Sequence, residues 1–331
     1  MIDLRLNHDN IDEVAQLWEE RLHRYLFEPG FKEKKIQQLT SKKYDTFTPY
    51  YDYFLEKIKR ETKINKATLR RVFAYFKTNF HSVILADEKE LRKLASVSNP
   101  ISLKGKNFEF FKDLMKGLYS DFTNDYGYEF FKILDIRTCP YCNRQFVFTC
   151  DRKIKTRPEY DHFYDKSEYP LLAVSFYNLV PSCHVCNHVK GTKHIKLNPY
   201  FRGFKSKFLI ADKDKYKKAM NANKALNLKT EKDFCLKYSH PTKHEKANIK
   251  NLGLDELYNE HKDYVLDIIE KAVSYNDGYK ESLLDSMAVS DYSLMNVHDF
   301  VWGKYLEVAN QEKMPLSKLT KDILDQLDIK R

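Results

Sequence analysis

The stretch "EYDHFYDKSEYPLLAVSFYNLVPSCHVCNHVKGTK", residues 159–193, holds an Asp-His pair, a later Asn-Leu and a Cys-x-x-Cys that runs into Asn-His-x-Lys-Gly. A second Cys-x-x-Cys, Cys139-Pro-Tyr-Cys142, precedes Cys183-His-Val-Cys186 in the chain. Two such knuckles present four thiolates as a tetrahedron, because each knuckle supplies the two sulfurs of one edge. We therefore expect Cys139, Cys142, Cys183 and Cys186 to bind one structural zinc ion.

The two remaining cysteines, Cys150 and Cys235, have no partner at ligand spacing, and we interpret them as free, buried thiols. Six cysteines in 331 residues are too few for a disulfide scaffold, so the paired knuckles favour metal binding in a reducing compartment. The opening "MIDLRLNHDNIDEV" has acids where a signal peptide has a positive start and an apolar run. The longest apolar stretch, residues 169–180, is too short and too polar to span a bilayer. We expect a soluble, cytoplasmic protein without a membrane partner.

The charge balance suits a polyanionic partner without proving one. Lys and Arg exceed Asp and Glu by 57 to 47, which gives a formal net charge of +10 and a pI near 9.0. A hydrophobic share of 42% is enough for an ordinary core. The sequence has no G-x-x-x-x-G-K-[ST] loop, so we expect no nucleotide hydrolysis by this chain itself.

Hydrophobic periodicity divides the chain into three regions. Residues 1–134 are predicted to be mainly helical, because apolar residues recur at helical spacing in "NIDEVAQLWEERLHRYLF", "ATLRRVFAYFKTNF" and "FFKDLMKGLYSDF". In the first of these, Asn10 and Glu13 are placed as a capping box. Residues 135–200 instead gather Cys, His, Asn and Pro around short β-like runs such as "QFVFT".

The third region, residues 201–331, begins with a basic polar segment that we interpret as an irregular connector. Helical patterns return in "LDELYNEHKDYVLDIIEKAV" and around Leu319, Ile323 and Leu327. The predicted fold class is therefore α+β: a small metal module at 135–200 between two mainly helical regions.

The residues between and after the knuckles resemble those of a known family. Asp161-His162, then Asn178-Leu179, then Cys-x-x-Cys-Asn-x-x-Lys-Gly resembles the HNH endonucleases, also called ββα-metal or His-Me finger nucleases, over roughly residues 135–195. The flanking "FYDKSEYP" and "SFYNLVPSC" resemble the HNH nucleases of bacterial phage-defence systems, including Septu-type systems. The resemblance implies a ββα-metal fold and one-metal hydrolysis of DNA that leaves 5′-phosphate and 3′-hydroxyl ends.

Phosphodiester hydrolysis requires a base for water, a hard cation and a scaffold that fixes the two. His162 is the candidate base, and Asp161, on the opposite side of an extended strand, is the candidate ligand of one Mg²⁺ or Mn²⁺. A helix starting near His184 is expected to supply the second ligand. The resemblance places that ligand at Asn187, with His188 as the alternate, since adjacent helix positions point about 100° apart. The resemblance also makes Asn178 the residue that braces the loop and orients His162.

Three further expectations concern partners and neighbours. Lys190 and Lys193 follow on the same helix and are expected to contact backbone phosphates. Asp165 stands where many relatives have Pro, and it is either a surface acid or a group in the outer shell of the site.

DNA is the expected substrate. The alternatives are an RNA-cleaving toxin nuclease acting on tRNA and a non-catalytic, zinc-dependent nucleic-acid-binding module. The defence-system resemblance implies a separate ATPase subunit that docks on the helical flanks.

Overall fold

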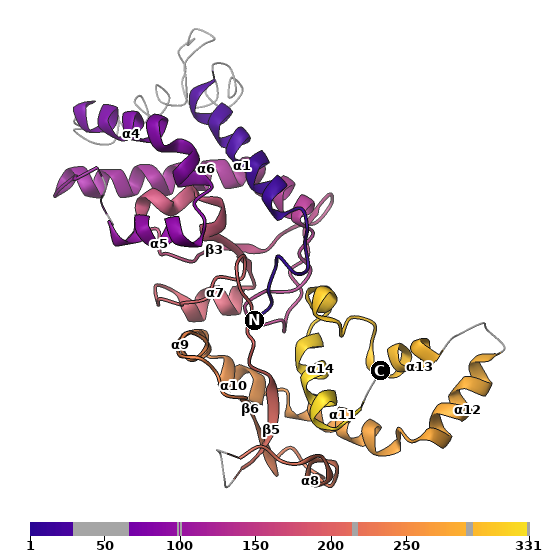
Figure 1. Ribbon diagram of the computed structural model, residues 1–331. Helices are drawn as coiled ribbons and strands as arrows, with labels where there is room; N and C mark the ends of the chain where they lie inside the picture. The colour runs from indigo at the N-terminus through magenta and orange to yellow at the C-terminus, as the bar shows by residue number, and fades with distance from the viewer. Residues whose placement is uncertain (29–65, 98, 100, 214–217, 289–293, 330–331) are drawn as a thin grey trace. The chain divides into compact units, whose positions relative to one another are not determined.

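The computed structural model describes residues 1–28, 66–97, 99, 101–213, 218–288 and 294–329 (Figure 1). The chain forms two compact units, each assembled from separate stretches. The helical unit comprises Asp9–Asp135 and Thr149–Val180, and the knuckle unit comprises Met1–His8, Ile136–Phe148 and Pro181–Arg331. This division is made by contact, whereas the regions 1–134, 135–200 and 201–331 expected from the sequence are contiguous and remain a prediction.

The helical unit is built mainly from four described helices with short strands and turns between them. Its elements are α1 (Ile11–Phe27), α4 (Lys66–Ile84), α5 (Glu88–Ser96), α6 (Lys106–Leu134), β1 (Cys150–Asp151), β2 (Lys155–Thr156), β3 (Glu159–His162) and the 3-10 turns η1 (Pro170–Val174) and η2 (Phe176–Asn178). Helices α4, α5 and α6 all contact η1 (Figure 1). The short turn η1 is therefore enclosed by helices.

Helix α1 confirms the predicted periodicity but not the predicted cap. The apolar residues whose spacing indicated the helix are all buried: Ile11, Val14, Ala15, Trp18, Leu22, Tyr25 and Leu26. Asn10 is the N-cap, yet it makes no capping hydrogen bond with its side chain. Its Nδ2 instead donates to the carbonyl oxygen of Ile133 at 3.0 Å. The predicted capping box is wrong because a tertiary hydrogen bond takes the Asn10 side chain.

Trp18 lies at the centre of the aromatic core of the helical unit. Its ring contacts Phe122 edge-on at 4.8 Å and Tyr160 at 5.8 Å, and its Nε1 donates to Val174 O at 3.0 Å. Edge-to-face aromatic pairs add to the stabilisation from burial. Trp18 therefore joins α1 to α6, to strand β3 and to η1.

The other predicted helical patterns of this unit are also found. In α6 the predicted apolar face is buried: Phe111, Leu114, Met115, Leu118 and Phe122. Of the face predicted for α4, Val72, Phe76 and Phe80 are buried and Phe73 is half-buried. The side chain of Leu69, also predicted on this face, lies outside the described residues. Helix α5 begins with a capping box in which Asp87 accepts from the Glu90 amide at 2.8 Å.

The knuckle unit contains short helices around a β-hairpin. Its elements are the end of β4 (Leu179–Ser182), α7 (His184–Lys190), β5 (Phe208–Asp212), α8 (Ala222–Leu226), β6 (Phe234–Tyr238), α9 (Lys243–Asn251), α10 (Leu254–Asn259), α11 (Lys262–Ser274), α12 (Asp277–Ala288), α13 (Leu294–Trp302), η3 (Val308–Lys313) and α14 (Ser317–Gln326). Strand β4 pairs with β3, and the chain passes from one unit to the other within β4.

The segment after residue 201 is not an irregular connector. Strand β5 pairs antiparallel with β6 in the register Phe208 opposite Tyr238, and on its other side the Phe208 amide donates to Asp322 of α14 at 2.9 Å. The expectation failed because both partners of β5 are distant in sequence, so periodicity within the segment does not indicate them.

The C-terminal helical patterns were predicted more closely. The stretch 254–273 forms α10 and α11, with Val265, Ile268, Ile269 and Ala272 buried. Helix α14 buries Leu319 and Ile323, and Leu327 behind it is buried too. The β-like run 145–149 forms a single bridge, from Phe146 to Thr138, and no strand is described there. None of the described helices is both long and apolar enough to cross a membrane.

Candidate functional site

The four knuckle cysteines come together in the knuckle unit. Cys139 and Cys142 lie in a turn closed by a hydrogen bond from the Cys139 amide to Gln145 O at 2.9 Å. Cys183 is the N-cap of α7, and its Sγ accepts from the Cys186 amide at 3.4 Å. The Arg144 amide donates to Cys142 Sγ, also at 3.4 Å. These backbone donors hold the two knuckles in shape and favour thiolate character at the sulfurs.

The sulfur positions suit a tetrahedral metal ion. The Sγ atoms of Cys139, Cys142, Cys183 and Cys186 all lie within 4.8 Å of one another, and all four residues are buried. The Cys142–Cys183 sulfur distance is 3.9 Å. Zinc–sulfur bonds of about 2.3 Å in a tetrahedron place sulfurs about 3.8 Å apart. The cluster can therefore hold a metal ion such as zinc, as the spacing of the cysteines predicted.

The electrostatics of the cluster also favour a bound cation. Burial raises the pKa of Cys139 well above its usual value, and hydrogen bonds with the neighbouring thiols raise that of Cys186. Hydrogen bonds from Cys139 lower the pKa of Cys142 and of Cys183. Four thiolates cannot all form in one buried site unless a cation compensates their charge.

Two hydrogen bonds join the turn of the first knuckle to α10 and to the start of α11. The Tyr258 hydroxyl donates to the carbonyl oxygen of Cys142. The Arg144 Nε donates to His261 Nε2 at 2.9 Å, so that nitrogen of the imidazole is an acceptor. Burial and the neighbouring guanidinium lower the pKa of His261. Helix α10 and the start of α11 therefore hold the knuckle turn in place.

The remaining cysteines, Cys150 and Cys235, were both predicted to be buried, but one of them is exposed. Cys235 is buried in β6, as expected, and its Sγ faces Ala211 O at 3.8 Å. Cys150 is exposed in β1, so the expectation of a buried thiol is wrong there. Among the described strands, β1 pairs with the two-residue strand β2, both of whose residues are exposed, so this hairpin lies at the surface.

A second polar cluster lies in the helical unit, around β3. Asp161 and His162 are adjacent residues of this strand and are only 3% and 5% exposed. His162 Nε2 lies 3.0 Å from the carbonyl oxygen of Ala173 in η1. A carbonyl oxygen only accepts, so Nε2 carries a proton. In the neutral ring the lone pair is therefore on Nδ1. A general base accepts a proton through such a lone pair.

Tyr119 and Lys166 flank the imidazole of His162. The Tyr119 ring of α6 meets it edge-on, with centroids 4.6 Å apart, and the Lys166 Nζ lies 3.5 Å from Nδ1. Burial raises the pKa of Tyr119 to about 12, and the charge of Asp161 adds to that rise while Arg157 opposes it. Tyr119 is therefore a neutral phenol at physiological pH.

Asn178 closes the loop that follows β3. Its Oδ1 accepts from the Tyr164 amide at 2.7 Å, and its Nδ2 donates to Tyr164 O at 3.1 Å and to Leu172 O at 2.9 Å. The Phe163 amide donates to Asn178 O at 2.8 Å. This fully buried side chain joins the backbone of Tyr164, two residues after His162, to Leu172 in the middle of η1, the residue before Ala173.

Asp165 shapes the next turn. Its Oδ1 accepts from the Ser167 amide at 2.7 Å, and its carbonyl oxygen accepts from the Tyr169 amide at 2.8 Å. Side-chain bonds of this kind stabilise tight turns. The half-buried Asp165 carboxylate thus stabilises the turn that contains Lys166.

The other predicted site residues lie on or just after α7, in the knuckle unit. Helix α7 begins at His184, as expected, and Asn187 is half-buried while His188 is exposed. Lys190 is only 1% exposed, with its Nζ 3.5 Å from Gly191 O, and Lys193 is exposed. The predicted Mg²⁺ ligands Asp161 and Asn187 thus belong to different units, and their pairing remains a prediction.

Sequence reasoning missed two residues beside His162. Tyr119 lies 43 positions earlier, on a helix whose apolar face gave no indication of a polar site. Lys166 follows His162 by four residues but looks like an ordinary surface lysine in the sequence. In the structure, Lys166 lies within the turn that is closed by the hydrogen bond from the Tyr169 amide to Asp165 O.

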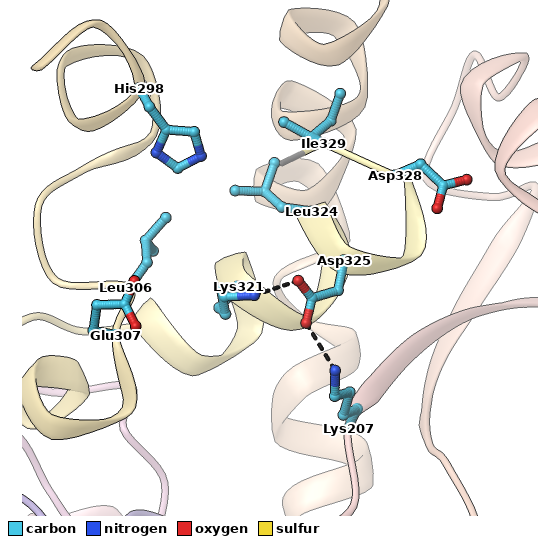
Figure 2. Close-up of a pocket in the computed structure, with 9 residues that line it drawn as sticks. All are labelled: Lys207, His298, Leu306, Glu307, Lys321, Leu324, Asp325, Asp328 and Ile329. Atoms are coloured by element: carbon cyan, nitrogen blue, oxygen red, sulfur yellow. Dashed lines mark hydrogen bonds and ion pairs between the residues drawn. The ribbon is translucent and has the colours of Figure 1, made fainter. Parts of the chain in front are cut away.

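A pocket of about 430 Å³ lies elsewhere in the knuckle unit, and Figure 2 shows its walls. It is lined by Lys207, His298, Leu306, Glu307, Lys321, Leu324, Asp325, Asp328 and Ile329. Lys207 and Lys321 reach opposite oxygens of Asp325, the former at 2.8 Å, so that carboxylate is already engaged (Figure 2). None of the predicted metal ligands or catalytic residues lines this pocket.

Comparison with known proteins does not place the chain in a family. No protein-family model matches it, and no curated protein or solved structure does either.

Proposed function

We propose that this protein is a divalent-metal-dependent endonuclease of the HNH type that hydrolyses phosphodiester bonds in DNA. In this proposal His162 is the general base, Asp161 and Asn187 hold one Mg²⁺ or Mn²⁺, and Asn178 braces the loop beside the base. The knuckle cysteines form a structural zinc site that supports α7, the helix of Asn187.

The observation that carries the proposal is the setting of His162. Its hydrogen bond to Ala173 O leaves the lone pair of the neutral ring on Nδ1. Asp161, the preceding residue of the strand, is likewise only 3% exposed. Burying ionisable groups is costly, so two consecutive buried ionisable residues support a functional site here.

The chemistry requires little beyond these groups. In this mechanism His162 Nδ1 accepts a proton from the attacking water, the water oxygen bonds to phosphorus as the bond between phosphorus and the 3′ oxygen breaks, and the 3′ oxygen takes a proton from solvent. A divalent ion, which Asp161 and Asn187 would hold, would neutralise negative charge at the phosphate. Asp161 and Asn187 offer the oxygen donors that Mg²⁺ and Mn²⁺ prefer, and His188 is the alternate to Asn187.

DNA is the proposed substrate on the strength of the net charge of +10 and of the sequence resemblance. Lys193, which is exposed, is better placed for phosphate contact than the buried Lys190. RNA offers the same phosphodiester bond, so tRNA belongs in the test. A separate ATPase subunit remains part of the proposal through the resemblance to defence nucleases.

The test compares wild type with His162→Ala on plasmid DNA and on total tRNA, with Mg²⁺, Mn²⁺ or EDTA. Removing a general base typically slows a reaction about 10²- to 10⁴-fold. His244→Ala is the matched control, because His244 is an exposed histidine on α9 with no role in the proposal. Zinc content and thermal unfolding verify that all three proteins are folded.

Metal-dependent cleavage that His162→Ala loses and His244→Ala retains is the expected result. Equal cleavage by all three folded proteins removes His162 from the mechanism. Cleavage of tRNA alone makes the protein a ribonuclease. If wild type cleaves neither substrate, the same assay with the proposed ATPase subunit decides between a regulated nuclease and a binding module.

A further inference from the structure

We infer that Lys166 is a phosphate-binding residue of the proposed hydrolytic site, holding an oxygen of the scissile phosphate beside Nδ1 of His162. This inference rests on the proposed function and adds to it a residue that the sequence did not single out. It concerns the helical unit alone.

The first observation is the position of the ammonium group. Lys166 Nζ lies 3.5 Å from His162 Nδ1 and 5.3 Å from the centroid of the Tyr119 ring. The opposite nitrogen, Nε2, faces Ala173 O. A water that gives its proton to Nδ1, and the phosphorus it attacks, must therefore approach on the side where Lys166 lies.

The second observation is that the backbone around Lys166 is fixed. Asp165 accepts from the Ser167 amide at 2.7 Å, and Tyr169 closes the turn onto Asp165 O at 2.8 Å. Asn178 holds Tyr164 from both its amide and its carbonyl group. Lys166 is thus anchored on both sides, and its half-buried side chain remains reachable from solvent.

Charge explains what the ammonium is for. Lys166 places a positive charge 3.5 Å from His162 Nδ1, on the side from which the water and the phosphorus must approach. The scissile phosphate is an anion, and lysine is a common point-charge ligand of phosphate oxygens.

The contact present without substrate is easily exchanged. At 3.5 Å an N–H···N contact is at the long end of hydrogen bonding, and it occupies the lone pair that the water needs. Transfer of the lysine from Nδ1 to a phosphate oxygen releases that lone pair when substrate binds. Lysine, with four rotatable methylenes, can make this movement without a backbone change.

The experiment measures binding of a fluorescent DNA duplex without Mg²⁺ or Mn²⁺, over a series of salt concentrations. Each lost phosphate contact reduces the slope of log K against log salt by about 0.9. We expect Lys166→Ala to reduce the slope by about that amount and to weaken binding about tenfold at low salt. Lys166→Arg should retain both slope and affinity, since a cation is preserved.

Two further variants separate charge from packing. Lys166→Met keeps the aliphatic stem over Tyr119 and removes only the charge, so it should behave like Lys166→Ala and remains informative if the alanine variant is unstable. Lys89→Ala, at an exposed position of α5, is the matched control and should bind like wild type. A purely structural role for Lys166 would leave the salt slope unchanged in any folded variant.

The outcomes are distinguishable from those of the nuclease test. Wild-type slope and affinity in folded Lys166→Ala and Lys166→Met overturn the inference, whether or not the protein cleaves DNA. A reduced slope in both variants, with wild-type behaviour in Lys89→Ala, supports the phosphate contact even if no cleavage is found. In that case the proposed hydrolysis would fail while the binding site stands.

Discussion

At the scale of single residues, Asn178 shows how one buried amide can determine a site without taking part in its chemistry. Its side chain makes three hydrogen bonds, all to backbone atoms of Tyr164 and Leu172. Those backbone groups lie on the loop behind His162 and in η1, next to Ala173. Anything that loosens Asn178 should therefore change the orientation of the imidazole.

We predict that Asn178→Ala lowers the free energy of unfolding by about 2–3 kcal/mol, because the backbone groups it satisfies are left without partners in a buried site. Asn178→Asp keeps the acceptor but loses both donated bonds, so it should also be destabilising. Urea unfolding of the zinc-loaded proteins measures the difference. Stability equal to wild type in both variants would mean that water replaces the side chain and that the brace is unimportant.

At the scale of elements, the Glu245 carboxylate connects α9 to the residues directly before β5. Thr242 and Glu245 form the capping box of α9, and Glu245 Oε1 also accepts from the amides of Lys205 at 2.8 Å and Ser206 at 3.0 Å. Burial works against ionisation of Glu245, but these backbone donors together lower its pKa below the usual value.

This lowered pKa makes the contribution of Glu245 dependent on pH. A carboxyl group whose folded pKa is depressed stabilises the fold fully above its unfolded pKa of about 4.5, and that contribution is lost as pH falls through the folded pKa. Glu245→Gln should therefore destabilise the protein by about 1.5–3 kcal/mol at pH 7. The gap to wild type should close below about pH 4. A gap that stays constant in urea unfolding across this range would contradict the assignment.

At the scale of the whole molecule, the cysteine cluster organises the knuckle unit. We expect one equivalent of zinc per chain, and chelation should lower the melting temperature and reverse on adding zinc back, since metal binding is coupled to folding. Cys139→Ser and Cys186→Ser should lose the metal, whereas Cys150→Ser and Cys235→Ser are the matched controls and should keep it. Metal analysis and thermal unfolding measure both effects. Full zinc retention in Cys139→Ser would exclude the four-sulfur site.

The sequence predicted those parts of the molecule that local spacing encodes. Paired Cys-x-x-Cys turns indicated the cluster because two sulfurs at that spacing fit one edge of a tetrahedron. The face of α1 was predicted residue by residue because Trp18 and its neighbours recur at helical spacing. In each case the physical constraint acts within a few residues.

The features that escaped prediction depend on distant partners. Strand β5 is paired by β6 and by Asp322 of α14, far along the chain. Asn10 is of a residue type preferred at helix N-caps, but its side chain donates a hydrogen bond to Ile133 O instead. Lys166 and Tyr119 acquire their setting only when β3 meets α6. Periodicity and spacing carry no information about such contacts.

The position of the cysteines along the chain has a consequence for how the protein tolerates change. Cys142 and Cys183 are 41 positions apart, and Thr149–Val180, which belongs to the helical unit, lies wholly between them. A metal ion bound to all four sulfurs would close this long loop at its base in the folded protein, and metal binding would offset the entropy cost of closing it, about 4 kcal/mol for a loop of this length. Because closure entropy grows only slowly with loop length, the inserted segment can lengthen, shorten or be exchanged at little thermodynamic cost. Evolution could thus vary the segment that carries Asp161 and His162 while the metal-closed base stays the same.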